Sequence, residues 1–232
     1  MRLTVKSINE APVILNPEGK LTILLRDLDL TECENLSITE NKFQVIDLSN
    51  NGLLKLGNIP PNFTNLECLL LSNNNISYID EDTFSSNNNI KSLMLYNNNI
   101  KSFQPIMKDK FTNLETLVLL GNPITELDNY RIFTIWLIPS LKVLDFQKIK
   151  NLERIEGEKL FGKNHDEFNQ LALEMLSKSS NNGQLNGNNK QVDNVVKKLS
   201  DNEKEELLKK LETATSLEEI EKIEEALKNG VV

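Results

Sequence analysis

Two segments of the chain, LECLLLSNNNI from Leu66 and IKSLMLYNNNI from Ile90, repeat one pattern of aliphatic residues and asparagine. The pattern, L-x-x-L-x-L-x-x-N/C-x-L, also fits FQVIDLSNNGL from Phe43, LETLVLLGNPI from Leu114 and, with one extra residue, LRDLDLTECENL from Leu25. A sixth copy, LKVLDFQKI from Leu141, lacks the asparagine. The copies start 18, 23, 24, 24 and 27 residues apart. One such unit cannot bury its apolar face alone, so we expect the copies to stack.

This period is typical of leucine-rich repeats. The first, fourth and sixth positions of the pattern then point inward from a short strand, and the chain turns sharply after it. Buried backbone groups at the turn need partners, and a side-chain amide can both donate and accept a hydrogen bond. We therefore predict a ladder with one residue from each repeat: Cys33, Asn51, Asn74, Asn98 and Asn122. The predicted fold is an α/β leucine-rich-repeat solenoid of about five repeats with caps and a curved parallel sheet, followed by a short helical tail.

The two ends of a repeat stack expose an apolar face and need covers. We expect residues 1–24 to form one cap, and the apolar stretch YRIFTIWLI, which contains Trp136, to form a helical plug at the other end. The predicted domains are the repeats with both caps at 1–162, an amphipathic segment and Asn/Ser/Gly-rich linker at 163–192, and a short helical docking element at 193–232. Capping boxes at Ser200 and Ser216 predict the two helices of this last element.

Composition excludes several classes of function. The net charge of −8 and the pI of about 4.9 give no general footprint for nucleic acid. The longest apolar run, IFTIWLI, is too short to span a bilayer, and two cysteines make no disulfide framework, so we expect an intracellular protein. The single histidine, His165, rules out a histidine-based triad or multi-histidine metal site, and no phosphate-binding glycine motif is present. We predict no enzyme activity, cofactor or metal.

A second motif follows the fifth repeat. It comprises Asn122, Pro123, Tyr130 and Arg131, then P-x-L-x-x-L-D ending at Asp145, and it resembles the carboxyl cap of a group of intracellular leucine-rich-repeat proteins. The continuation VLDFQKIK and ERIEGEKLF is similar to the spliceosomal U-two A-prime family, and TSLEEIEKIEEALKNG near the end resembles its fungal members. A phosphatase-regulating leucine-rich-repeat protein is the alternative, but it would carry about twice as many repeats.

The resemblance implies a nuclear, non-catalytic scaffold of the small nuclear ribonucleoprotein used for branch-site recognition in splicing. Its concave face would grip a helix of an RNA-recognition-motif partner of the B-double-prime type. The pair would hold a stem-loop near the 3′ end of U-two RNA, with the RNA bound mainly through the partner. The carboxyl-terminal helices would dock on other spliceosome proteins.

Residue types on the predicted concave face agree with such a partner. Strand alternation places the second, third, fifth and seventh positions of each repeat on this face. An apolar track there suits an amphipathic helix, and an acidic edge suits basic residues on it. The track comprises Cys68, Leu70, Met94, Tyr96, Val118 and Leu120, and the edge comprises Asp27, Asp29 and Asp47. A covering of the track by the chain's own tail is the other interpretation.

For RNA the sequence offers only a small basic cluster just past the last strand: Lys148, Lys150 and Arg154. Phosphate contact by these side chains is one interpretation and an ordinary solvated charge group is the other. No row of aromatic residues on a sheet is present, so we expect no independent recognition of single strands.

Overall fold

The computed structural model describes residues 2–85, 88–163 and 168–180. The described residues lie within one compact unit of the chain. The rest of the linker, the two predicted helices with their capping boxes, and His165 lie outside the described residues. The predicted amphipathic segment after residue 163 is present as helix α5 (Gln170–Ser180).

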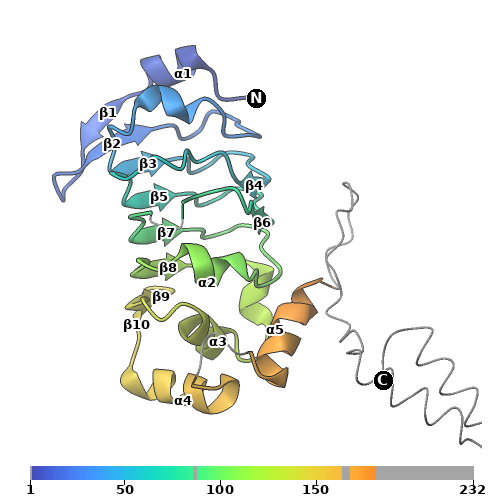
Figure 1. Ribbon diagram of the computed structural model, residues 1–232. Helices are drawn as coiled ribbons and strands as arrows, with labels where there is room; N and C mark the ends of the chain where they lie inside the picture. The colour runs from blue at the N-terminus through green and yellow to red at the C-terminus, as the bar shows by residue number, and fades with distance from the viewer. Residues whose placement is uncertain (1, 86–87, 164–167, 181–232) are drawn as a thin grey trace, which may run out of the picture. The chain divides into compact units, whose positions relative to one another are not determined.

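An eight-stranded sheet in the order β1-β2-β3-β5-β7-β8-β9-β10 forms one side of this unit (Figure 1). Neighbours from β2 to β9 are parallel, whereas β1 and β10 pair antiparallel at the two edges. Strand bounds are β1 Val13–Leu15, β2 Leu21–Leu24, β3 Val45–Asp47, β5 Cys68–Leu70, β7 Ser92–Met94, β8 Thr116–Val118, β9 Val143–Leu144 and β10 Gln147–Lys148. Each repeat therefore contributes one short strand, and the predicted solenoid fold is confirmed.

The strand register corrects the frame of the first repeat. Ile23 pairs with Ile46 in the parallel ladder, so the first repeat starts at Lys20 and not at Leu25. The spacing to the second repeat then becomes 23 residues. Cys33 is buried in the core but does not occupy a ladder position, contrary to our prediction. The wrong frame fitted because Leu28 and Leu30 imitate the spacing of Ile23 and Leu25.

The asparagine ladder is confirmed at its four asparagine positions. Asn98 is typical: its Oδ1 accepts from the Ile76 amide at 3.0 Å, and its Nδ2 donates to the carbonyls of Leu71 and Leu95. Equivalent bonds are made by Asn51, Asn74 and Asn122. Each asparagine side chain therefore supplies hydrogen bonds to the turn of the repeat before it as well as to its own turn.

A second column of residues, one position earlier, has left-handed backbone. Asp27, Asn50, Asn73, Asn97 and Gly121 all have φ between 51° and 76°. Asparagine and aspartate tolerate this region better than other residues with a side chain. Asn73 Nδ2 donates to Asn50 Oδ1 and Asn97 Nδ2 to Asn73 Oδ1, which makes an exposed second ladder. At Gly121 a Cβ would lie 2.2 Å from Asn97 Oδ1, so this position requires glycine. The first two asparagines of each NNNI therefore serve different ladders.

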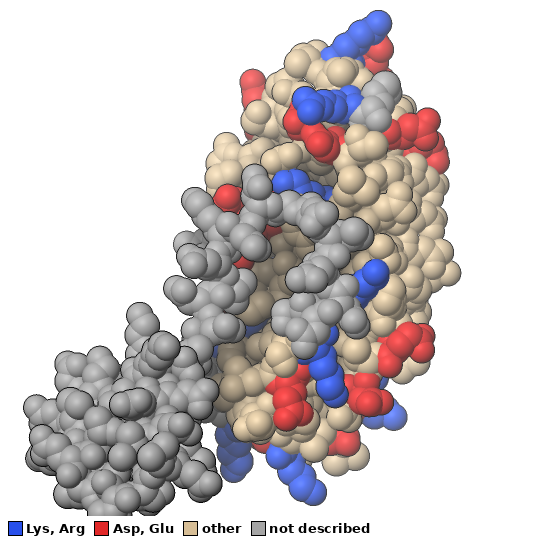
Figure 2. All heavy atoms as spheres, turned by 90° about the vertical axis from the view of Figure 1, so that its right-hand side faces the viewer, with Lys and Arg blue, Asp and Glu red and all other residues tan. Residues whose placement is uncertain are grey.

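The side of the stack opposite the large sheet is built from short segments. It carries a two-stranded parallel sheet of β4 (Lys55–Leu56) and β6 (Tyr78–Ile79), and the short helix α2 (Ile106–Lys110) in the next repeat. The 3₁₀ turn η1 (Leu36–Thr39) belongs to the first repeat. We call the surface around β4, β6 and the turns that follow them the convex side. Both acidic and basic side chains lie on it (Figure 2).

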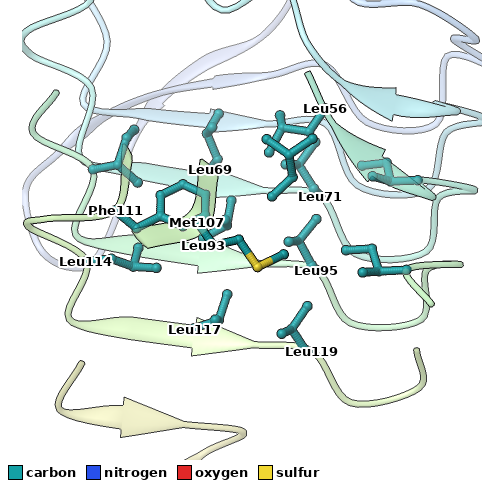
Figure 3. Packing of buried hydrophobic residues seen from close by; sticks show 14 of the residues in the cluster. Leu56, Leu69, Leu71, Leu93, Leu95, Met107, Phe111, Leu114, Leu117 and Leu119 are labelled. Carbon is teal, nitrogen blue, oxygen red and sulfur yellow. The ribbon is translucent and has the colours of Figure 1, made fainter. Parts of the chain in front are cut away.

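The core fills the space between the sheet and the convex side. Leucines at the fourth and sixth pattern positions form two columns, exemplified by Leu69 and Leu71, which continue through the neighbouring strands (Figure 3). Met107 and Phe111 pack on these columns from the convex side. Two buried side chains from each of the first five repeats give one continuous apolar interior.

The amino-terminal cap is a short helix and a hairpin. Helix α1 (Val5–Glu10) starts at Thr4, whose hydroxyl accepts from the Ser7 amide. Its Ile8 and the preceding Leu3 are buried against the first repeat. Strand β1 then covers the edge of β2 by antiparallel pairing.

The carboxyl-terminal cap contains helix α3 (Tyr130–Leu137), preceded by the 3₁₀ turn η2 (Pro123–Glu126). Six of the eight residues of α3 are buried, and Trp136 lies within an aromatic cluster, so its predicted role in the plug is confirmed. Helices α4 (Asn151–Phe161) and α5 follow, and Phe168 packs on Trp136 edge to face. No described helix is long and apolar enough to cross a membrane.

Polar residues of the second motif fix this cap to the last repeat. Tyr130 donates to Asp145 Oδ2 at 2.9 Å, and Asp145 Oδ1 accepts from the amide of Leu119 at 2.7 Å. In the earlier repeats a backbone carbonyl of the next strand accepts from the equivalent amide. Arg131 donates to the Leu144 carbonyl and pairs with Glu153 of α4 at 2.6 Å, which lowers the pKa of that carboxyl. The motif therefore ends the parallel sheet and holds α4.

Candidate partner-binding face

The concave face is the outer face of the large sheet, formed by the second, third, fifth and seventh pattern positions. Register aligns these positions into rows across the repeats. Leu70, Met94 and Val118 are neighbours in the row of fifth positions, and Cys68 lies in the row of third positions between Val45 and Ser92. Adjacent strands lie about 4.8 Å apart, so each row is a continuous strip.

An apolar strip is accessible at the middle of this face. Leu70, Met94 and Cys68 are half-buried, whereas Tyr96 and Leu120 are 41% and 38% exposed. The backbone bond from the Asn97 amide to the Leu120 carbonyl places Tyr96 and Leu120 on neighbouring repeats. These five residues form what we call the apolar track. A large tyrosine and a flexible methionine in one strip are suited to packing against a helix.

Val118 does not belong to the apolar track, although the sequence placed it there. It occupies the expected position of the row but is fully buried. The Asp145 amide donates to the Leu117 carbonyl, and Asp145 Oδ1 accepts from the Leu119 amide, so the backbone on both sides of Val118 is bonded to the turn that ends the sheet.

The predicted acidic edge is also corrected. Asp47 is fully buried, accepts from Arg26 Nε at 2.9 Å and accepts from the Ser49 amide at 3.0 Å. Its charge is therefore neutralised within the first two repeats. Asp27 and Asp29 are exposed but lie in the left-handed turn after β2, because the frame of the first repeat is shifted. Arg26 is the charged side chain that the face presents there.

Charges alternate along the row of second positions, and Lys20 at the start of the first repeat joins their ion pairs. The Glu67 carboxylate forms ion pairs with Lys20 Nζ at 3.0 Å and with Lys91 Nζ at 3.1 Å. Both contacts lower the pKa of Glu67. Lys142 pairs with Glu115 at 2.8 Å in the later repeats. The apolar track is therefore bordered by a polar row with no large excess of either sign.

The track offers no activated group for catalysis. Burial raises the pKa of the Cys68 thiol to about 11, so at neutral pH the sulfur is a protonated, apolar contact atom. No group of three metal-ligating side chains is found within the described ranges. The arrangement is suited to binding a surface.

The basic cluster past the last strand is only partly available. Lys148 on β10 and Lys150 before α4 are exposed. Arg154 instead donates to the carbonyls of Pro139 and Leu141, so its guanidinium is used to hold the chain between α3 and β9. Sequence reasoning missed Phe146, which fills the sixth pattern position yet is 68% exposed between β9 and β10. The missing asparagine of that copy was the signal that its turn differs.

Comparison with known proteins gives the family. A leucine-rich-repeat family model matches residues 1–175. The U2 small nuclear ribonucleoprotein A′ of Candida albicans is 65% identical over the whole length of both chains, and that of Debaryomyces hansenii is 46% identical over 99% of each. The chain belongs to the U2 small nuclear ribonucleoprotein A′ family. It is thus a non-catalytic component of the spliceosomal U2 particle, whose proteins are nuclear splicing factors.

A solved structure of this family is similar in fold. A chain in the crystal structure of the Drosophila melanogaster SNF/U2A′ complex aligns with a TM-score of 0.67 and 33% identity. The alignment covers 77% of this chain and 99% of that chain. The predicted resemblance to the U-two A-prime family is confirmed.

Proposed function

We propose that the concave face binds a helix of an RNA-recognition-motif protein of the B-double-prime type within the nuclear U2 particle. The observation that carries this proposal is the apolar track, which is accessible at the centre of a sheet otherwise covered by polar and paired side chains. The SNF/U2A′ complex supports it, because there a protein of this family is joined to a protein partner.

The geometry suits an amphipathic helix better than an extended strand. The inner strands of the sheet are paired on both edges, so their backbone groups are not free to add another strand along the track. Tyr96 and Leu120 would pack against the apolar face of the helix, and Met94 would fill the space between them. Arg26 and the paired Lys91 and Glu67 lie on the same face as the apolar track and would fix the register of the helix.

The complex would in turn hold the stem-loop near the 3′ end of U2 RNA, with the partner making most of the contacts. Lys148 and Lys150 are exposed beside the last strand and are our proposed phosphate contacts from this chain. Docking of other spliceosome proteins on the carboxyl-terminal helices remains a proposal from the sequence, since those residues lie outside the described ranges.

Two point variants of the full chain test the concave face. Tyr96→Ala and Met94→Glu should each weaken binding of the purified partner by roughly 2 kcal/mol or more, because one removes an anchor and the other buries a charge. Tyr78→Ala is the matched control, since Tyr78 is 45% exposed on the convex side. Calorimetric titration gives the three affinities. Unchanged affinity in both track variants would refute the proposed face, whereas equal losses in all three would indicate misfolding.

A further inference from the structure

An exposed aromatic ring stands at the end of the large sheet, outside the residues assigned to the apolar track. Phe146 is 68% exposed at the tip of the hairpin between β9 and β10, whose strands lie at the lower edge of the sheet in Figure 1. Among the described residues it belongs neither to the core nor to the aromatic cluster of the carboxyl-terminal cap. Packing within the chain therefore does not account for this ring.

The backbone at Phe146 is unfavourable for the side chain that it carries. Gln147 pairs with Leu144, so Asp145 and Phe146 are the two central residues of the hairpin turn. Both have left-handed backbone, with φ of 52° and 61°. Two-residue turns with positive φ at both positions favour asparagine or aspartate followed by glycine, and a bulky residue in this conformation is rare and strained. A strained side chain that is not packed in its own chain points to a contact outside the chain.

Hydrogen bonds hold this turn in place. Asp145 Oδ1 accepts from the amides of Leu119 at 2.7 Å and Leu120 at 3.2 Å, and Asp145 Oδ2 accepts from the Tyr130 hydroxyl at 2.9 Å. Burial and the neighbouring carboxylate raise the pKa of Tyr130, so its hydroxyl remains a donor at neutral pH. The residue next to Phe146 is therefore fixed, and binding through this ring would cost little backbone freedom.

The same bonds place Phe146 next to the apolar track. Leu120, whose amide reaches Asp145, is the last member of the track along the chain and is 38% exposed. Phe146 follows Asp145 directly, with the two Cα atoms about 3.8 Å apart. Three strand spacings separate β5 from β9, about 14 Å in all, and a helix of about ten residues has this length. One helix on the track can therefore extend from Leu70 to Phe146.

From these observations we infer that Phe146 is a further anchor for the protein partner of the concave face. Its ring would pack against an apolar side chain of the partner helix, just beyond the side chains that contact Tyr96 and Leu120. The inference rests on the proposed function, because it requires the partner helix to lie along the apolar track. Stacking on a base of U2 RNA is the competing use of an exposed ring, and the test separates the two.

The test titrates the full chain with the purified RNA-recognition-motif partner in the absence of RNA. Phe146→Ala should weaken binding roughly tenfold, as expected for truncation of an aromatic anchor. Leu152→Ala is the matched control and should leave the affinity unchanged, because Leu152 is 75% exposed on α4. Tyr96→Ala is measured in the same series. A loss with Tyr96→Ala but none with Phe146→Ala would overturn the inference and leave the proposed face intact, whereas unchanged affinity in both would overturn both. A loss with Phe146→Ala that appears only when the assembled complex binds RNA would also overturn the inference, in favour of base stacking.

A second variant separates binding from folding. Phe146→Asn removes the ring and places in the turn a residue that tolerates left-handed backbone. We expect it to weaken partner binding as much as Phe146→Ala does and to raise the melting temperature by about 1–3 °C, because the strain is relieved. Affinity and stability would then change in opposite directions, which misfolding cannot produce. A melting temperature lowered by several degrees in Phe146→Asn would show that the ring supports the fold, and the inference would be wrong.

Discussion

The two ends of the repeat stack differ in how they cover the same kind of apolar surface. At the amino-terminal end, β1 adds a backbone pairing, but its three side chains, Val13, Ile14 and Leu15, are all exposed. At the carboxyl-terminal end, α3 buries Phe133 among the rings of Phe103 and Phe161, at centroid distances of 4.7 and 4.9 Å. At the amino-terminal end only Leu3 and Ile8 of the cap extend the core, whereas at the other end a cluster of aromatic rings extends it. We therefore expect stability to be concentrated at the carboxyl-terminal end.

The largest expected effect is at this aromatic cluster. Phe133→Ala should lower the free energy of unfolding by about 3–5 kcal/mol, because it opens a cavity between tightly packed rings. Chemical denaturation measures this loss. Phe146→Ala is the matched control, since that ring is 68% exposed, and it should change stability by about 0.5 kcal/mol or less. Similar losses in the two variants would contradict the contrast between the ends.

The regular middle of the stack gives the next effect. Asn98→Ala should cost about 1–3 kcal/mol, because the amide of Ile76 and the carbonyls of Leu71 and Leu95 lose their side-chain partner in a buried turn. Asn99→Ala changes the exposed neighbour and should be nearly neutral. Thermal unfolding of both variants compares them. A neutral Asn98→Ala would show that the ladder is not a source of stability.

A smaller effect, dependent on pH, is expected where the carboxyl-terminal cap is held by charge. The contact with Arg131 lowers the pKa of Glu153 below its usual 4.5, so the ionised form is favoured by folding. This contribution is present above about pH 4.5 and is lost as the pH falls through the lowered pKa. Glu153→Gln should therefore cost about 1 kcal/mol at pH 7 and progressively less below pH 4.5. Denaturation curves at several pH values test this, with the exposed Glu156→Gln as control. If the stability difference between Glu153→Gln and the unchanged protein grew as the pH fell, the prediction would be wrong.

The smallest effect is predicted for the hairpin at the other end. Leu15→Thr should change the free energy of unfolding by about 0.5 kcal/mol or less, because Leu15 is 70% exposed and threonine is favoured in strands. The same denaturation assay applies. A loss above about 1 kcal/mol would mean that the hairpin is stabilised by side-chain packing as well as by backbone pairing, and the contrast between the ends would weaken.

Much of this architecture was predictable because each feature of the repeat recurs in several copies of the sequence. The inward positions and the buried asparagines recur in successive copies, so a single misleading residue does not matter. In the first repeat no asparagine marks the turn, and two overlapping leucine spacings fit equally well. Only the strand register separates them, which is why Cys33, Asp27 and Asp29 were misplaced.

The partner-binding face was predictable in outline and not in detail. Alternation along a strand correctly places Leu70, Met94 and Tyr96 on the outer face. Whether such a side chain is accessible depends on neighbours from other repeats. Asp47 is paired with Arg26, and the turn at Asp145 is bonded to the backbone on both sides of Val118; neither contact follows from the repeat pattern.

The buried asparagine ladder also has a direction. The Oδ1 atoms of Asn74, Asn98 and Asn122 all accept from an amide of the repeat before them. During synthesis, the turn of any repeat therefore stays incomplete until the next one, 23 or 24 residues later, has left the ribosome. At usual rates of translation that delay is about 1–5 s for each repeat. Growth of the chain would complete the turns one at a time. The Asp145 carboxylate, which accepts from the amides of Leu119 and Leu120 just after β8, would mark the point at which no further asparagine repeat is awaited.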